Sequence, residues 1–153
     1  MAGYTHVLAA VDLGADTELL LSRASEVAQR FGARLSLAHV VEYVLAEPAG
    51  ETLLPPPMTL EPELASGAER QLAEFAARAG AGEADRHVAV GSIPAELSRL
   101  VEDLGADLLI AGAHERHWLA FFASGTERSL LKRVACDVLV VRLPKPRDGD
   151  ASS

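Results

Sequence analysis

The feature that most constrains this chain is a regular alternation between short apolar runs and longer segments with helical periodicity. The runs typical of strands cover residues 7–11, 33–41, 86–90, 107–111 and 138–141. The first run is apolar on both faces, as a buried parallel strand is. The run at 86–90 alternates polar and apolar residues instead, which favours a place at the edge of a sheet.

Apolar residues recur at helical spacing in the segments between these runs. Helices are predicted at about 20–31, 62–79 and 93–104, and a fourth one at Leu130, Leu131 and Val134. Gly32 and Gly105 follow the first and third helix, where a left-handed residue commonly ends a helix. Five strands alternating with four helices predict a single doubly wound α/β domain, with a parallel sheet and helices on both faces.

The chain has 153 residues, enough for one domain, which we assign to residues 1–143. The irregular segment at about 42–60 contains three consecutive prolines, Pro55 to Pro57, and is predicted to be a mobile excursion within that domain. Residues 144–153 are predicted to form a polar tail.

Charge and composition narrow the classes of partner. The formal net charge of −8 disfavours nucleic acid and anionic membrane surfaces. No apolar run approaches the ~20 residues of a spanning helix, and Met1 to Tyr4 do not open a signal peptide. We therefore expect a cytoplasmic protein. The single cysteine, Cys136, allows no internal disulfide and is expected to be buried and inert.

Candidate binding residues follow the strands, because ligands of such sheets sit at the carboxyl ends. Asp12 follows the first strand, where its carboxylate either accepts hydrogen bonds from a ligand or binds the turn amides of residues 13–15. Ser124-Gly125-Thr126 opens the predicted fourth helix. This segment suits an anion, and Ser124 with Glu127 equally suits a capping box.

The segment after the fourth strand offers two weaker candidates. His114 and His117 have no third metal ligand at a matching spacing, so no metal is predicted. Trp118, Phe121 and Phe122 either fold onto the core or form a contact patch for a protein partner. No nucleophile and base occur in a known catalytic motif, so no catalytic residue is predicted.

Several stretches together resemble one family, the universal stress proteins, over about residues 3–143. They are His6-Val-Leu-Ala-Ala-Val-Asp12, Leu35-Ser-Leu-Ala-His-Val40, Gly105-Ala-Asp-Leu-Leu-Ile-Ala-Gly112, Ser124-Gly-Thr126 and Cys136-Asp-Val-Leu-Val-Val141. The resemblance implies a strand order of 3-2-1-4-5 and a homodimer. It also implies a choice between members that bind ATP and members, named for universal stress protein A, that do not retain it.

The binding members carry a glycine, two residues, a glycine, nine residues, a glycine and then serine or threonine. Gly112, Gly125 and Thr126 match this pattern, but Glu115 stands at the second glycine. A carboxylate about 5 Å from a phosphate charge, at an effective dielectric of about 20, costs about 3 kcal/mol. That energy corresponds to about a hundredfold in affinity. We therefore expect no retained ATP, with an ATP-binding sensor or weak ATPase as the alternative.

If ATP binds, the resemblance assigns two groups of contacts. Asp12 and Val41 would lie near the base and ribose, and Gly112, Ser124, Gly125 and Thr126 would surround the phosphates. The expected strand order leaves the fifth strand at an edge. Because Val138, Leu139, Val140 and Val141 carry no charge, we expect two copies to pair along this strand.

Overall fold

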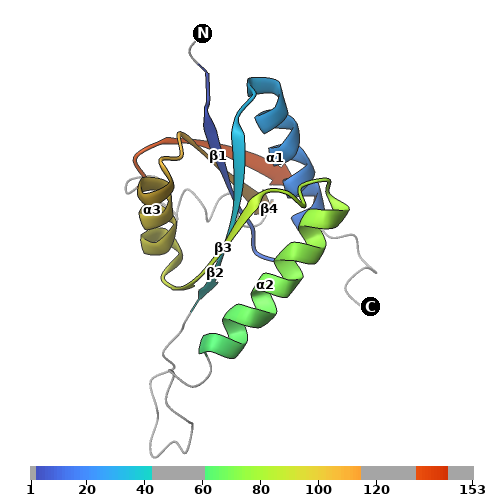
Figure 1. The fold of residues 1–153 in the computed structure, drawn as a ribbon, viewed down its shortest axis with the longest axis vertical. Coiled ribbons are helices and arrows are strands. Elements are labelled where there is room, and N and C mark those ends of the chain that lie inside the picture. Colours follow the sequence, from blue (N-terminus) through green and yellow to red (C-terminus); the bar gives the residue numbers. More distant parts are fainter. Residues whose placement is uncertain (1–2, 43–60, 115–133, 145–153) are drawn as a thin grey trace, which may run out of the picture.

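The computed structural model describes residues 3–42, 61–114 and 134–144 (Figure 1). Its strands are β1 (His6–Ala10), β2 (Arg34–Glu42), β3 (Asp85–Gly91), β4 (Leu108–His114) and β5 (Asp137–Leu143). The helices are α1 (Thr17–Phe31), α2 (Glu61–Arg78) and α3 (Ile93–Leu104). The strands form one sheet in the order β3-β2-β1-β4-β5, and every pair is parallel, which confirms the expected fold.

Two apolar clusters hold the helices against opposite faces of the sheet. The first joins α1 and α2 to the sheet through residues such as Leu21, Leu72 and Ile110, and the second joins α3 through Leu8, Leu97 and Leu109. Figure 1 shows this arrangement, with α1 and α2 on one side of the sheet and α3 on the other. Among the described residues, no helix has both the length and the apolar character to cross a membrane.

Two helices end in the same way on the two faces of the sheet. Gly32 (φ 63°) and Gly105 (φ 67°) adopt the left-handed conformation predicted for them. After each glycine the chain turns directly into a strand beside β1. Arg34 N donates to Thr5 O at 2.9 Å, and Asp107 N donates to His6 O at 3.0 Å. The start of β1 is therefore bonded on both sides.

The amino edge of the sheet, where the strands begin, is held by polar contacts. The Asp107 carboxylate accepts hydrogen bonds from Thr5 N, from Thr5 Oγ1 and from His6 N, all within 3.1 Å. Burial opposes ionisation of Asp107, but these hydrogen bonds outweigh it and hold the pKa of the carboxyl below its usual value. Asp107 is therefore a carboxylate that joins the start of β1 to the start of β4.

His6 extends this polar region beneath α3. Its Nδ1 lies 3.0 Å from Leu104 O and its Nε2 lies 2.7 Å from Ser36 Oγ. Since a carbonyl only accepts, Nδ1 carries a proton and donates it to Leu104 O, while Nε2 forms a hydrogen bond with the serine hydroxyl. Both side chains are buried, and both have their hydrogen-bonding needs met.

The predicted element boundaries differ from the observed ones by at most three residues. The fifth strand extends beyond the predicted 138–141 at both ends, because Asp137 pairs with Leu108 and Leu143 pairs with His114. The second strand includes Glu42, which the sequence assigned to the excursion; residues 43–60 lie outside the described residues. Val134, assigned to the fourth helix, is buried and not helical.

Candidate functional site

The carboxyl edge of the sheet brings together three of the six predicted binding residues. Asp12 lies just beyond β1, Val41 lies near the end of β2 and Gly112 lies within β4. Ala10 pairs with Ala38 on one side and with Ala111 on the other, so the three positions lie within a few residues of one level. The sheet order reverses at β1, which makes this edge a topological switch point.

Ser124, Gly125 and Thr126 lie outside the described residues. The same holds for Glu115, His117, Trp118, Phe121 and Phe122, and for most of the predicted fourth helix. His114 is the last residue of β4. Within residues 3–42, 61–114 and 134–144, no three potential metal-binding side chains cluster together.

Asp12 shapes the loop that follows β1. Its Oδ1 accepts a hydrogen bond from Gly14 N at 2.8 Å, so the turn interpretation of this residue is confirmed. The side chain is exposed, and no hydrogen bond to its Oδ2 is found within the described part of the chain. A ligand hydroxyl or amine can therefore donate to Oδ2 while the turn stays intact.

Main-chain contacts and one histidine hold this loop in an unusual conformation. Leu13 has φ 63°, in the left-handed region that a leucine seldom adopts. His39 Nδ1 lies 2.8 Å from Val11 O and donates to it, while Val11 N donates to Ala38 O at 2.9 Å. Strain of this kind persists where the surroundings determine it and is common at binding sites.

Sequence reasoning missed His39 and Leu13 as parts of the site. The available signal for His39 was a histidine in the predicted strand 35–41, whose other residues are apolar except for Ser36. Leucine carries no signal for a left-handed conformation, so Leu13 could not be found in this way.

Thr17, in the first turn of α1, is a further residue near this edge of the sheet that sequence reasoning did not single out. This residue is 1% exposed, and no hydrogen-bond partner of its hydroxyl oxygen is found in the part of the chain that the structure describes. Buried hydroxyls are usually paired. The sequence offered no signal for this unpaired group, because threonine is common in first turns.

Gly112 has a packing role in the described structure. A Cβ atom at this position would lie 2.7 Å from Leu143 Cδ1 and 3.2 Å from Leu143 Cγ. It would also lie 3.5 Å from Leu20 Cδ2 on α1. The space beside Gly112 is therefore filled by apolar side chains, and packing alone accounts for a glycine here.

Cys136 lies half-buried, just before β5. Burial raises the pKa of its thiol, and the charges of Asp137 and Asp107 act in the same direction. A raised pKa favours the neutral thiol, which is the less reactive form. The expected full burial was wrong, since Cys136 is only partly buried.

The fold and the switch-point edge define the class of doubly wound α/β proteins, whose ligands, where they bind one, lie at the carboxyl ends of the strands. A family model described as "Universal stress protein family" matches residues 3–142. The chain therefore belongs to the universal stress protein family.

Individual relatives agree with this assignment. The chain is 31% identical to universal stress protein A homolog 1 of Coxiella burnetii over 138 residues, which are 90% of this chain and 96% of the relative. A universal stress family structure from Burkholderia pseudomallei has a TM-score of 0.66 at 23% identity, with 90% of this chain and 96% of that chain covered. A universal stress protein crystallised in complex with cAMP has a TM-score of 0.60 at 22% identity, with 92% of this chain and 98% of that chain covered.

Proposed function

We propose that this chain acts in the stress response as a cytoplasmic homodimer that works through protein contacts and does not retain ATP. The observation that carries the proposal is the edge position of β5 together with its apolar surface. The cytoplasmic location of the protein remains a prediction from the sequence.

The free side of β5 suits a second copy of the same chain. β5 pairs only with β4 within the sheet, so its outer hydrogen-bonding groups face away from the described strands. Leu139, in the middle of the strand, is 40% exposed, and Val138, Val140 and Val141 are partly buried. An apolar edge strand without a central charge pairs readily with another strand, and a two-fold axis would cover both copies at once.

The absence of retained ATP is supported by two residues of the glycine pattern. Glu115 replaces the second glycine and adds a negative charge where a triphosphate would lie. Gly112 matches the pattern, but its packing against Leu143 already explains the glycine. The match at this position therefore carries little weight for a phosphate site.

The alternative function is that of a nucleotide-binding sensor or weak ATPase. It is favoured by Asp12, whose Oδ2 stays open toward solvent at the switch point. The similarity to a universal stress protein in complex with cAMP points the same way. In this alternative, Asp12 and Val41 contact the nucleoside, and Gly112, Ser124, Gly125 and Thr126 contact the phosphates.

Sedimentation of the wild type and of Leu139→Asp tests the dimer. We expect a dimer at micromolar concentration for the wild type and a monomer with an unchanged circular dichroism spectrum for the variant. Leu64→Asp is the matched control, since Leu64 on α2 is also an exposed leucine, at 47%. A monomeric wild type, or equal loss in both variants, would overturn the proposal.

Mass spectrometry of the purified protein tests for retained nucleotide, and two variants test the cause. Glu115→Gly should gain about a hundredfold in ATP affinity by calorimetry, from the loss of about 3 kcal/mol of repulsion. Glu115→Gln removes the charge and keeps the bulk, so it separates the two effects. Nucleotide bound to the unmodified protein would favour the alternative, and no gain in either variant would show that another residue decides.

A further inference from the structure

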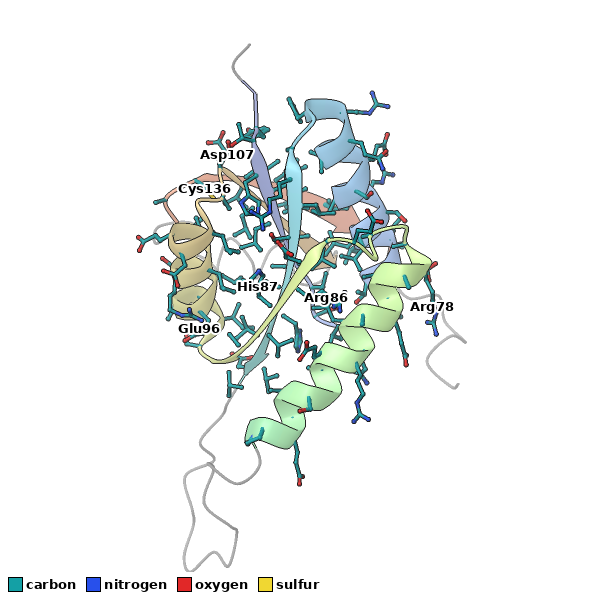
Figure 2. All side chains as sticks on the ribbon, viewed as in Figure 1. Arg78, Arg86, His87, Glu96, Asp107 and Cys136 are labelled. Carbon is teal, nitrogen blue, oxygen red and sulfur yellow. The ribbon has the colours of Figure 1, made fainter. Side chains whose placement is uncertain are left out.

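A pocket of about 540 Å³ opens at the amino edge of the sheet, at the opposite end from Asp12. It lies between the starts of β1, β4 and β5 and the end of α1. Figure 2 labels Asp107 and Cys136 at this end of the molecule. The side chains that define it include Tyr4, Phe31, Asp107, Cys136 and Asp137. Its volume is that of a small-molecule site.

One part of the pocket is aromatic. Tyr4 and Phe31 meet edge to face, with ring centroids 5.1 Å apart and an interplanar angle of 83°. Phe31 is 50% exposed, so part of an aromatic ring is open to a ligand. Aromatic faces attract cations, and guanidinium groups stack on them particularly well.

Within the described residues, the lining of the pocket is negatively charged: it contains Asp107 and Asp137 and no lysine, arginine or histidine. Asp107 is already saturated by Thr5 and His6, so it supplies a fixed charge. Asp137 uses only Oδ2, which accepts the Tyr4 hydroxyl at 2.8 Å. Within the described residues, no hydrogen bond to Asp137 Oδ1 is found.

Two neighbouring groups respond to this negative potential. The hydrogen bond to Asp137 raises the pKa of Tyr4, and the charges of Asp137 and Asp107 add to the effect. Burial raises the pKa of Cys136, and the same two carboxylates raise it further. The two carboxylates of the described lining therefore act on both neighbouring groups in the direction that a bound cation would oppose.

We propose that this pocket binds a small molecule that carries a guanidinium group. The planar cation would place its edge against Asp137 Oδ1 and its face against the exposed aromatic surface, with Asp107 contributing long-range attraction. This site is separate from the carboxyl edge and does not depend on whether the chain binds a nucleotide.

Amide NMR titration of the full chain with methylguanidinium tests the proposal, with methylurea as the neutral probe of the same shape. We expect saturating shifts at the amides of the pocket for the cation and none for methylurea. Asp137→Asn should weaken binding by about tenfold or more, by loss of the charged partner. Glu69→Gln, an equal change of charge on the exposed face of α2, should leave it unchanged.

The thiol of Cys136 provides a second readout in the same sample. A cation bound beside it offsets the two carboxylates, so the pKa of the thiol should fall when methylguanidinium is added. Since Cys136 is the single cysteine, the thiolate absorbance reports on this pocket alone. Equal responses to the cation and to methylurea, or equal binding by Asp137→Asn and Glu69→Gln, would overturn the proposal.

Discussion

Two carboxylates at opposite edges of the sheet show how differently one side chain can be used. Asp107, at the amino edge, accepts hydrogen bonds from Thr5 and His6, which are about a hundred positions away in the chain. Asp12, at the carboxyl edge, accepts one hydrogen bond from Gly14, two positions away. The first carboxylate joins two strands, whereas the second shapes its own loop and has one oxygen without a hydrogen bond from the described residues. The comparison separates residues that maintain the fold from residues that are available for binding.

The largest effect on stability is expected for Asp107→Asn. The amide group replaces one acceptor oxygen by a donor that faces the donors of Thr5, so we expect a loss of about 2 kcal/mol in the free energy of unfolding. Urea unfolding at pH 7 measures it. Asp103→Asn on α3 is the control, since it removes only an exposed ion pair with Arg99 and should change stability by less than about 0.5 kcal/mol.

The stabilisation that the Asp107 carboxylate provides is also expected to depend on pH. The folded-state pKa of Asp107 is lowered, so its stabilisation is complete above the ordinary pKa of about 3.9 and is lost as the pH falls through the folded value. The difference between wild type and Asp107→Asn should therefore be constant at neutral pH and shrink below about pH 4. A difference that persists undiminished in acid would contradict the role of the charge.

A smaller effect is expected for Gly112→Ala. The new methyl group would press on Leu143 in the core, which costs about 1–2 kcal/mol. Gly67→Ala is the matched control, because that position on α2 has open space and should gain about 0.5–1 kcal/mol from helix propensity. Thermal unfolding measures both effects: we expect a lower midpoint temperature for Gly112→Ala and a higher one for Gly67→Ala. If the thermal stability of Gly112→Ala equals that of the wild type, Gly112 does not pack tightly against Leu143, and the packing role is wrong.

The smallest effect on stability is expected for Asp12→Asn. The amide oxygen can still accept from Gly14 N, so the free energy of unfolding should change by less than about 0.5 kcal/mol. Any ligand that donates to the carboxylate should bind more weakly to this variant. A loss of stability as large as that of Asp107→Asn would remove the distinction between the two edges.

The layout of the fold could be predicted because it depends on local signals. Apolar runs, helical spacing, and glycines at positions 32 and 105 are all read within a few residues, and they led to the correct type of element for the five strands and for the helices α1, α2 and α3. Strand ends were less accurate, since the pairing of Asp137 and Leu143 depends on the neighbouring strand and not on their own hydrophobicity. The same limit explains the helical assignment of Val134, an apolar residue that is buried without being helical.

The candidate site could be predicted only in part. Asp12 was found because its position after an apolar run is itself a signal. The contact of His39 with Val11 spans 28 positions, and that of Asp107 with Thr5 spans 102, so no periodicity in the sequence reveals either one. Gly112 was predicted to follow the fourth strand, but it lies within β4, and its contact with Leu143 depends on a pairing between β4 and β5 that the sequence does not display.

The strand order has a consequence for the way the chain is made. β1 leaves the ribosome first and occupies the centre of the sheet, and the later strands are added outward, β2 and β3 on one side and then β4 and β5 on the other. The strand proposed for pairing with a second copy is thus synthesised after the other four strands of the sheet. A nascent chain that lacks β5 lacks the proposed contact surface, so the proposed association would wait until all five strands have been made.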